Sequence, residues 1–294
     1  MYNRIMVPLD GSNLSAGVLP YVRCLAYALK TPVEILYMDD TTHRTSGAMQ
    51  KQAAEYLESI AASFSGITSV TCKIEPGNPA GVIINRASAE SGILTAMATH
   101  GYSGAARWLI GSVAEKVLRA LTSDLLLVRH QEANGSGEVE LETVLVPLDC
   151  SQPAEKVLPT VSELAKLLHL RIELVHVTKH IYSGPPDAFL PVFGAIPNWK
   201  ELWERDKAFA NEYLTEKVAQ LRAQGLENVS SLVVEGGADG AAAEIIDLAQ
   251  NIWGGLIVMT SHGQTGIGRW LIGSATERVA RYSKKPVLIV RPQK

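Results

Sequence analysis

The chain contains one long sequence pattern twice, and this repeat limits what it can fold into. IMVPLDGSNLSAGVLPYV, from Ile5, matches VLVPLDCSQPAEKVLPTV, from Val144, at an offset of 139 residues. THGYSGAARWLIGSV, from Thr99, matches SHGQTGIGRWLIGSA, from Ser261, at an offset of 162 residues. The difference between the offsets, 23 residues, is additional chain in the second copy. A duplication on this scale predicts two domains of the same fold.

The repeat also predicts where the domains begin and end. We place the first domain at residues 1–130 and the second at residues 141–294. The segment QEANGSGEVE, residues 131–140, is rich in small and polar residues and is typical of an exposed linker. Most of the additional chain lies at residues 179–204, which carry four prolines and several aromatic residues. Three roles stay open for this insertion: a lid over the second site, a docking surface, or a packed surface loop.

Short apolar runs alternate with helical patterns in each half. The first copy predicts strands at RIMVPL, VEILYM, VTCKIE, GILTAM and DLLLVR, with helices over residues 14–29, 45–64, 79–89 and 112–120. The second copy predicts strands at VLVPL, RIELVHV, SSLVVE, GLIVM and PVLIV. Strands rich in Val, Ile and Leu between helices indicate an α/β fold with two tandem, doubly wound, five-stranded parallel sheets. The apolar last strand of each half should lie at a sheet edge, and antiparallel pairing of these two strands would join the halves as a pseudo-dimer.

Composition narrows the choice of partners and compartment. Apolar residues make up 47% of the chain, charged residues 19%, and the net charge is −3, which argues against nucleic acid as a partner. The three cysteines, Cys24, Cys72 and Cys150, are far apart and form no disulfide or metal-binding pattern. We therefore expect a soluble, cytoplasmic protein without a membrane partner and without a bound metal centre. Two copies of the chain could associate further as a homodimer.

Each half has an aspartate directly after its first strand. Pro8 and Asp10 close that strand in the first half, and Pro147 and Asp149 close it in the second. In doubly wound sheets, ligands bind beyond the carboxyl ends of the strands. The carboxylate at this position has two compatible roles, accepting hydrogen bonds from a ribose or capping the following helix.

The duplicated phrase follows the fourth strand and combines two glycines with the start of a helix. Glycine lets main-chain N–H groups approach an anion closely, and the free N–H groups of a helix start attract negative charge. A capping box from serine to glutamate is the competing, purely structural interpretation. The adjacent histidines could contact phosphate or fix the turn. These residues are Gly101, Gly104, Gly111, Ser112 and Val113 with His100, and Gly263, Gly266, Gly273, Ser274 and Ala275 with His262.

These motifs resemble those of the universal stress protein family, and the resemblance covers nearly all of both halves. The family pattern G-x2-G-x9-G-[ST] is matched twice in its later part, by H-G-x9-G-S, together with Asp10 and Asp149. The pattern's first glycine is replaced by Ala98 and by Thr260. Thr260 carries a branched side chain, so we expect unequal affinity at the two sites.

The resemblance implies a sheet order of 3-2-1-4-5 in each half, as in adenine nucleotide alpha hydrolase-like domains. It also implies that the ligand is ATP, ADP or AMP, with Mg²⁺ left open as its companion. Asp10 and Asp149 would contact ribose, and the glycine loops with their serines would hold phosphates. Adenine would lie beside four apolar side chains at the strand ends, namely Met38, Met97, Val177 and Met259.

The sequence does not contain the motifs of a fast phosphate-transfer enzyme. It has no G-x-x-x-x-G-K-[ST] loop, and GIGRWL at residues 266–271 does not complete a dinucleotide fingerprint. We therefore expect a nucleotide-binding stress-response module rather than an enzyme. The alternatives are a nucleotide-free interaction protein and a slow ATPase.

Overall fold

The computed structural model describes residues 2–39, 47–67, 69–100, 110–129, 138–178, 199–263 and 272–291. Every strand predicted from the sequence is present, and no strand end shifts by more than one residue. The elements of the first half are β1 (Arg4–Leu9), α1 (Asn13–Ala16), α2 (Leu19–Leu29), β2 (Val33–Asp39), α3 (Gly47–Ala62), β3 (Val70–Pro76), α4 (Pro79–Ser88), β4 (Ile93–Ala98), α5 (Ser112–Ala120) and β5 (Leu125–Val128).

The second half repeats this order of elements. It consists of β6 (Thr143–Pro147), α6 (Gln152–Glu155), α7 (Leu158–Leu168), β7 (Arg171–Val177), α8 (Trp199–Ala223), β8 (Val229–Val234), α9 (Ala241–Gln250), β9 (Gly255–Thr260), α10 (Ser274–Tyr282) and β10 (Val287–Val290). No described helix is both long and apolar enough to cross a membrane, since the 25-residue α8 is polar over most of its surface.

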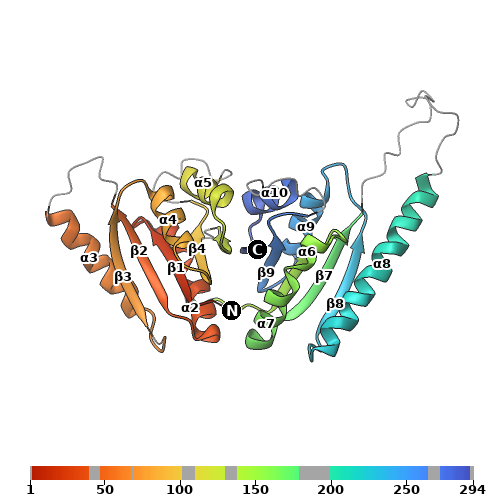
Figure 1. The fold of residues 1–294 in the computed structure, drawn as a ribbon, viewed down its shortest axis with the longest axis horizontal. Helices are drawn as coiled ribbons and strands as arrows, with labels where there is room; N and C mark the ends of the chain where they lie inside the picture. Colours follow the sequence, from red (N-terminus) through yellow and green to blue (C-terminus); the bar gives the residue numbers. More distant parts are fainter. Residues whose placement is uncertain are drawn as a thin grey trace, which may run out of the picture.

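All ten strands belong to one sheet, with the order β3-β2-β1-β4-β5-β10-β9-β6-β7-β8. Each half therefore has the order 3-2-1-4-5, and its strands are parallel. β5 and β10 pair antiparallel at the centre, with Leu126 opposite Leu288. The predicted fold class and the predicted pairing of the last strands are confirmed, and this pairing joins the two five-stranded sheets into one continuous sheet (Figure 1).

Both faces of the central strands are buried, which explains why those strands are apolar almost throughout, whereas the edge strands β3 and β8 are largely exposed. Along β1, Ile5 and Val7 point into one hydrophobic cluster while Met6 points into the other. Helices α2, α3, α7 and α8 cover the first cluster, and α4, α5, α9 and α10 cover the second (Figure 1). Such double cover is the normal environment of parallel sheets.

The helix predicted over residues 14–29 is two helices in the structure. α1 ends at Ala16, and Pro20 lies in the first turn of α2. A proline ring clashes with the carbonyl four residues earlier, which here belongs to Ala16, so one continuous helix cannot pass this point. Pro159 has the same place in α7, and α6 ends at Glu155 for the same reason.

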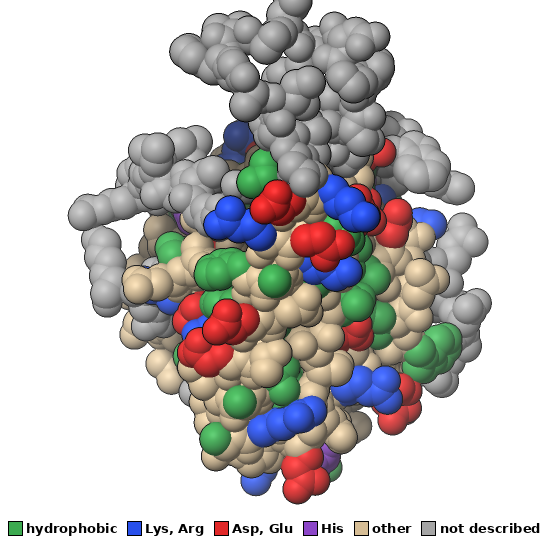
Figure 2. Space-filling model, turned by 90° about the vertical axis from the view of Figure 1, so that its right-hand side faces the viewer, with side chains coloured by type: hydrophobic (Ala, Val, Ile, Leu, Met, Phe, Trp, Pro, Cys, Tyr) green, Lys and Arg blue, Asp and Glu red, His purple; other side chains and the backbone are tan. Residues whose placement is uncertain are grey.

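Most of the insertion, residues 179–198, lies outside the described residues. The three roles considered for it therefore all stay predictions. Its last part, residues 199–204, forms the start of α8, which is 25 residues long against 16 for α3. Acidic and basic side chains are interspersed on the face of the molecule that carries α8 (Figure 2). Buried residues such as Leu214 and Leu221 attach the other face of α8 to the sheet.

Candidate functional site

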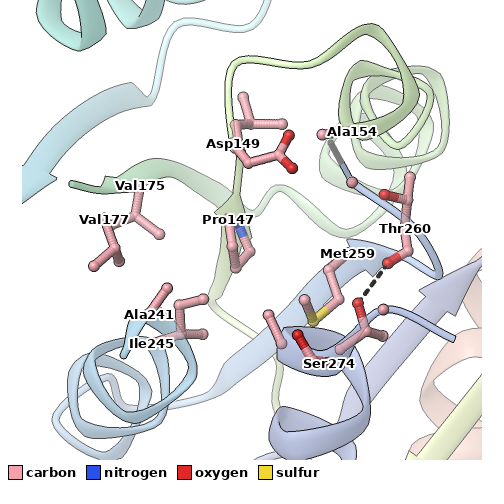
Figure 3. Close-up of a pocket in the computed structure, with 15 residues that line it drawn as sticks. Pro147, Asp149, Ala154, Val175, Val177, Ala241, Ile245, Met259, Thr260 and Ser274 are labelled. Carbon is pink, nitrogen blue, oxygen red and sulfur yellow. Dashed lines mark hydrogen bonds between the residues drawn. The ribbon is translucent and has the colours of Figure 1, made fainter. Parts of the chain in front are cut away.

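A cavity of about 360 Å³ opens in the second half, at the carboxyl ends of the parallel strands (Figure 3). Crossovers leave β6 and β9 in opposite directions here, which makes this the expected ligand position in a doubly wound sheet. Eight of the predicted site residues line it: Pro147, Asp149, Val177, Met259, Gly263, Gly273, Ser274 and Ala275. The structure therefore brings together residues that lie up to 128 positions apart in the sequence, from Pro147 to Ala275.

The cavity has an apolar end and a polar end. In Figure 3, Val175, Val177, Ala241 and Ile245 form one wall, and Asp149 lies on the other side of Pro147. Thr260 also lines the cavity, as its place in the family pattern implied. The sequence interpretation missed six lining residues: Leu148, Ala154, Val175, Ala241, Ile245 and Thr276. Strand alternation could have identified Val175, because it shares a face of β7 with Val177.

Asp149 is held in place by the turn that follows β6. Its Oδ1 accepts hydrogen bonds from the Ser151 main-chain N–H at 3.1 Å and from the Ser151 hydroxyl at 2.5 Å. Ser151 in turn caps α6 by accepting a bond from the Ala154 N–H at 3.3 Å. Asp149 therefore does not cap α6 itself, but positions Ser151, which does. This structural role is compatible with the place of Asp149 in the cavity lining.

Gly263 is in close contact with this carboxylate. A Cβ atom at position 263 would lie 2.0 Å from Asp149 Oδ2, far inside any allowed contact. Only glycine leaves enough room for the main chain after β9 and the carboxylate after β6 to approach this closely.

The start of α10 forms the other side of the polar end. Its N-cap is Gly273, with no side-chain cap, and Ser274 is the first helical residue. The capping-box interpretation is therefore wrong: Glu277 bonds to arginines, and Gly273 takes the N-cap position. The same correction applies to α5, where Gly111 is the N-cap. A helix start with no capping side chain presents free N–H groups and the positive end of the helix dipole.

Main-chain bonds fix these helix starts against the preceding strands. The Gly273 N–H donates to the Ser261 carbonyl at 2.7 Å, and the Gly111 N–H donates to the Thr99 carbonyl at 2.7 Å. Thr260, which replaces the first glycine of the family pattern, lines the cavity and directs its hydroxyl to the His262 carbonyl at 2.8 Å. Its own carbonyl accepts a bond from the Thr276 hydroxyl, drawn as the dashed line in Figure 3. The branched side chain is thus part of the turn's hydrogen bonding.

The two histidines are bonded to their preceding residues. His262 Nδ1 lies 2.8 Å from the Ser261 hydroxyl, and His100 Nδ1 lies 3.0 Å from the Thr99 hydroxyl. Burial lowers the pKa of His262, and the charge of Arg291 lowers it further. Burial and Arg129 have the same effect on the pKa of His100. Neutral imidazole is therefore favoured at neutral pH, and these rings offer hydrogen bonds rather than charge.

The first half places its corresponding residues in the same way. Asp10 Oδ1 accepts bonds from the Ser12 N–H and hydroxyl at 3.0 and 2.6 Å, and Pro8 precedes it in β1. Met38, Met97 and Val113 share one hydrophobic cluster between strand ends and the start of α5, where Gly111 and Ser112 lie. Gly101, Gly104 and Gly266 lie outside the described residues.

Cys150 and His176 are neighbours of the cavity with reactive side-chain types. Cys150 Sγ lies 3.4 Å from His176 Nδ1, but the same nitrogen lies 2.8 Å from the Leu148 carbonyl. A carbonyl only accepts, so Nδ1 carries the proton and cannot remove one from the thiol. Burial and the nearby carboxylates of Asp149, Asp206 and Glu155 raise the pKa of Cys150 to about 11. The thiol is therefore not activated.

Comparison with known proteins finds the same family pattern in each of the two repeated halves. A sequence model described as the universal stress protein family matches residues 1–129 and 140–291. The universal stress protein MJ0577 of Methanocaldococcus jannaschii is 30% identical over 157 residues, which cover 52% of this chain and 96% of that protein. A universal stress protein of Mycolicibacterium smegmatis is 24% identical over 246 residues, which cover 83% of this chain and 77% of that protein.

A solved structure extends the likeness over the whole chain. A universal stress protein of Archaeoglobus fulgidus superposes with a TM-score of 0.71 at 22% identity, covering 99% of both chains. At that identity, the comparison establishes the shared fold. Taken with the two matched segments, it identifies the chain as a member of the universal stress protein family that contains two tandem domains.

Proposed function

We propose that this protein binds an adenine nucleotide in each half and acts as a regulatory or interaction module in a stress response. The observation that carries the proposal is the second-half cavity, which combines an apolar wall, a fixed carboxylate and an uncapped helix start. A base, a ribose and a phosphate chain need these three environments in this order. The first half has the corresponding side chains at the same strand ends.

The assignment of nucleotide parts follows from chemistry. The wall of Val175, Val177 and Ile245 with Met259 suits the face of an adenine ring, because its contribution is burial. Asp149 suits ribose hydroxyls, since an ionised carboxylate only accepts hydrogen bonds. The start of α10 at Ser274 suits phosphate oxygens, which accept bonds from N–H and hydroxyl groups.

The described residues do not fit a metal held by the protein itself. Among them, no group of three or more His, Cys, Asp or Glu side chains could hold an ion. Mg²⁺ would therefore arrive with the nucleotide, bound mainly by phosphate oxygens and water.

The side chains around the cavity favour binding over rapid hydrolysis. His176 donates its Nδ1 proton to a carbonyl, and the thiol of Cys150 is held in its neutral form. Neither of these two described groups is arranged as a general base for an attacking water, so we propose slow or absent ATP hydrolysis.

Calorimetric titration of the dialysed protein with ATP, ADP and AMP tests the proposal. We expect two binding events for the full chain, and the loss of one event in each of Gly111→Val and Gly273→Val. In both positions a Cβ meets the carbonyl of the preceding strand at 3.1 to 3.3 Å, and the valine methyl groups would fill the anion site. Chromatography of the nucleotide after incubation measures hydrolysis. Absence of any binding favours the nucleotide-free interaction protein, and rapid turnover favours an ATPase.

Gly263→Ala is a smaller change that acts through Asp149. The added methyl group would displace the carboxylate, and we expect affinity at the second site to fall about tenfold, or ~1.4 kcal/mol. Gly81→Ala is the matched control, because its Cβ meets nothing closer than 3.8 Å within α4. Equal nucleotide affinity in Gly263→Ala and Gly81→Ala would contradict the role given to Asp149.

A further inference from the structure

The helices that begin at the two proposed phosphate sites are joined to each other by a ring of four charges. Glu115 of α5 bonds to Arg281 of α10 at 2.7 Å, and Glu277 of α10 bonds to Arg119 of α5 at 2.7 Å. Within each helix, Arg119 lies 3.5 Å from Glu115 and Arg281 lies 2.8 Å from Glu277. Each arginine is therefore shared by one glutamate from each half.

The ring lies close to both proposed anion sites. Glu115 and Glu277 are in the first turns of their helices, three residues after Ser112 and Ser274. At a rise of about 1.5 Å per residue this is roughly 4.5 Å along the helix axis, well inside the screening length of about 8 Å in physiological salt. A phosphate at either helix start would act directly on the charges of the ring.

A second pair of arginines crosses between the halves. Arg129, at the end of β5, donates to the Arg281 carbonyl in the last turn of α10. Arg291, at the end of β10, donates to the Leu118 carbonyl in the last turn of α5. Burial, and then the arginine of its own half, lower the pKa of His100 and of His262. Through these arginines, each histidine is linked to the helix that starts at the other site.

We infer that the two nucleotide sites are coupled negatively through the Glu115–Arg281–Glu277–Arg119 ring. A phosphate at the start of α5 repels Glu115 and attracts Arg281, which then neutralises Glu277 less well. The two glutamates are left to share Arg119. The less neutralised Glu277 repels a phosphate arriving at the start of α10, so the second nucleotide binds more weakly than the same site would bind it alone. This inference rests on the proposed function.

Titration calorimetry with ATP tests the coupling in the full chain. Gly111→Val and Gly273→Val report the affinity of each site while the other is blocked, and the wild-type protein reports the overall affinity for two nucleotides. The product of the two single-site association constants should exceed the wild-type overall constant by about fivefold or more, the lower end of typical coupling between sites. Glu115→Gln with Glu277→Gln, combined with the same glycine variants, should bring this ratio close to one.

A matched control separates the ring from a general change of charge. Glu55→Gln with Glu216→Gln removes the same two charges from exposed positions on α3 and α8, and it should leave the ratio unchanged. Raising KCl from 50 to 500 mM should lower the wild-type ratio, because the ring side chains are 19 to 52% exposed. Circular dichroism checks that each variant is folded.

The outcomes distinguish the inference from the function on which it rests. Two binding events with a ratio near one, or a ratio that survives Glu115→Gln with Glu277→Gln, would overturn the coupling and leave nucleotide binding standing. A wild-type protein that binds no nucleotide, or only one, would overturn the duplicated sites and the coupling with them.

Discussion

The two halves have diverged at the residue that follows each site aspartate. Gly11 has a φ of +82°, and a Cβ there would lie 3.3 Å from the Tyr37 ring. The equivalent Cys150 keeps the positive φ, at +62°, and its thiol lies against His176, which replaces the tyrosine. The smaller imidazole ring makes room for the thiol, so the pair has changed together while the backbone turn has stayed the same.

The half-buried histidines His100 and His262 give the protein a pH dependence at the residue scale. Burial, and then a neighbouring arginine, lower the pKa of His100 and of His262. Between the lowered value and the ordinary value near 6.5, the unfolded chain binds more protons than the folded one. The free energy of unfolding should therefore fall as the pH drops below about 6.5.

Urea unfolding at pH 7.5 and pH 5.5 measures this effect. His100→Gln with His262→Gln should reduce the loss of stability between the two pH values, because glutamine does not titrate. The exposed His169, with a φ of +56°, provides the control His169→Asn, which should keep the wild-type pH dependence. An unchanged pH dependence in the double glutamine variant would contradict the assignment.

At the scale of elements, α8 differs from its counterpart α3 in length and in its attachment. The Lys217 ammonium is buried and lies 3.1 Å from Glu155 of α6, and it also lies over the Tyr213 ring. Burial is the main cause of the raised pKa of Tyr213, and Glu155 adds to it. Packing on β8 and this polar contact together hold the longer helix against the sheet.

Two substitutions on α8 test this packing. Leu214 is 1% exposed, and Leu214→Ala should lower the free energy of unfolding by about 2–5 kcal/mol through lost burial and a residual cavity. Phe209 on the same helix is 58% exposed, and Phe209→Ala should change stability by less than about 1 kcal/mol. Urea unfolding compares the two, and similar losses would mean that α8 is not held against the sheet as described.

At the scale of the whole molecule, the halves share one sheet and a partly buried polar contact. Asp124 accepts a bond from the Arg291 main-chain N–H at 2.8 Å and from the Tyr2 hydroxyl at 2.7 Å. Burial raises the pKa of Asp124, and these partners oppose the increase. Burial also lowers the pKa of Arg291 to about 10, which the charge of Asp124 partly counteracts. The contact has no symmetric copy, because Pro286 stands at the position equivalent to Asp124.

Removing Asp124 should destabilise both halves together. Asp124→Ala removes the acceptor of the Arg291 main-chain N–H and of the Tyr2 hydroxyl, and we expect a loss of about 1–3 kcal/mol. Tyr2→Phe removes one hydrogen bond and should cost about 1 kcal/mol. Hydrogen exchange should report reduced protection in β1 and in β6 alike for Asp124→Ala. Loss of protection confined to one half would mean that the halves unfold independently.

The sequence by itself determined the duplication, the strand positions and the residues near each proposed site. These features depend on local patterns: apolar runs predict buried strands, and Ser112 and Ser274 follow glycines that begin helices. The start of α5 at Ser112 was predicted to the residue for this reason. The break between α1 and α2 was missed, although Pro20 provided the signal.

The tertiary structure alone decided which groups meet across the chain. Glycine rather than serine takes the N-cap positions of α5 and α10, because the main-chain N–H of Gly273 is already bonded to the Ser261 carbonyl. The close approach of Gly263 to Asp149 and the ion pair of Glu115 with Arg281 join residues more than a hundred positions apart. Such contacts depend on the register and twist of one shared sheet, and no local pattern in the sequence records those distances.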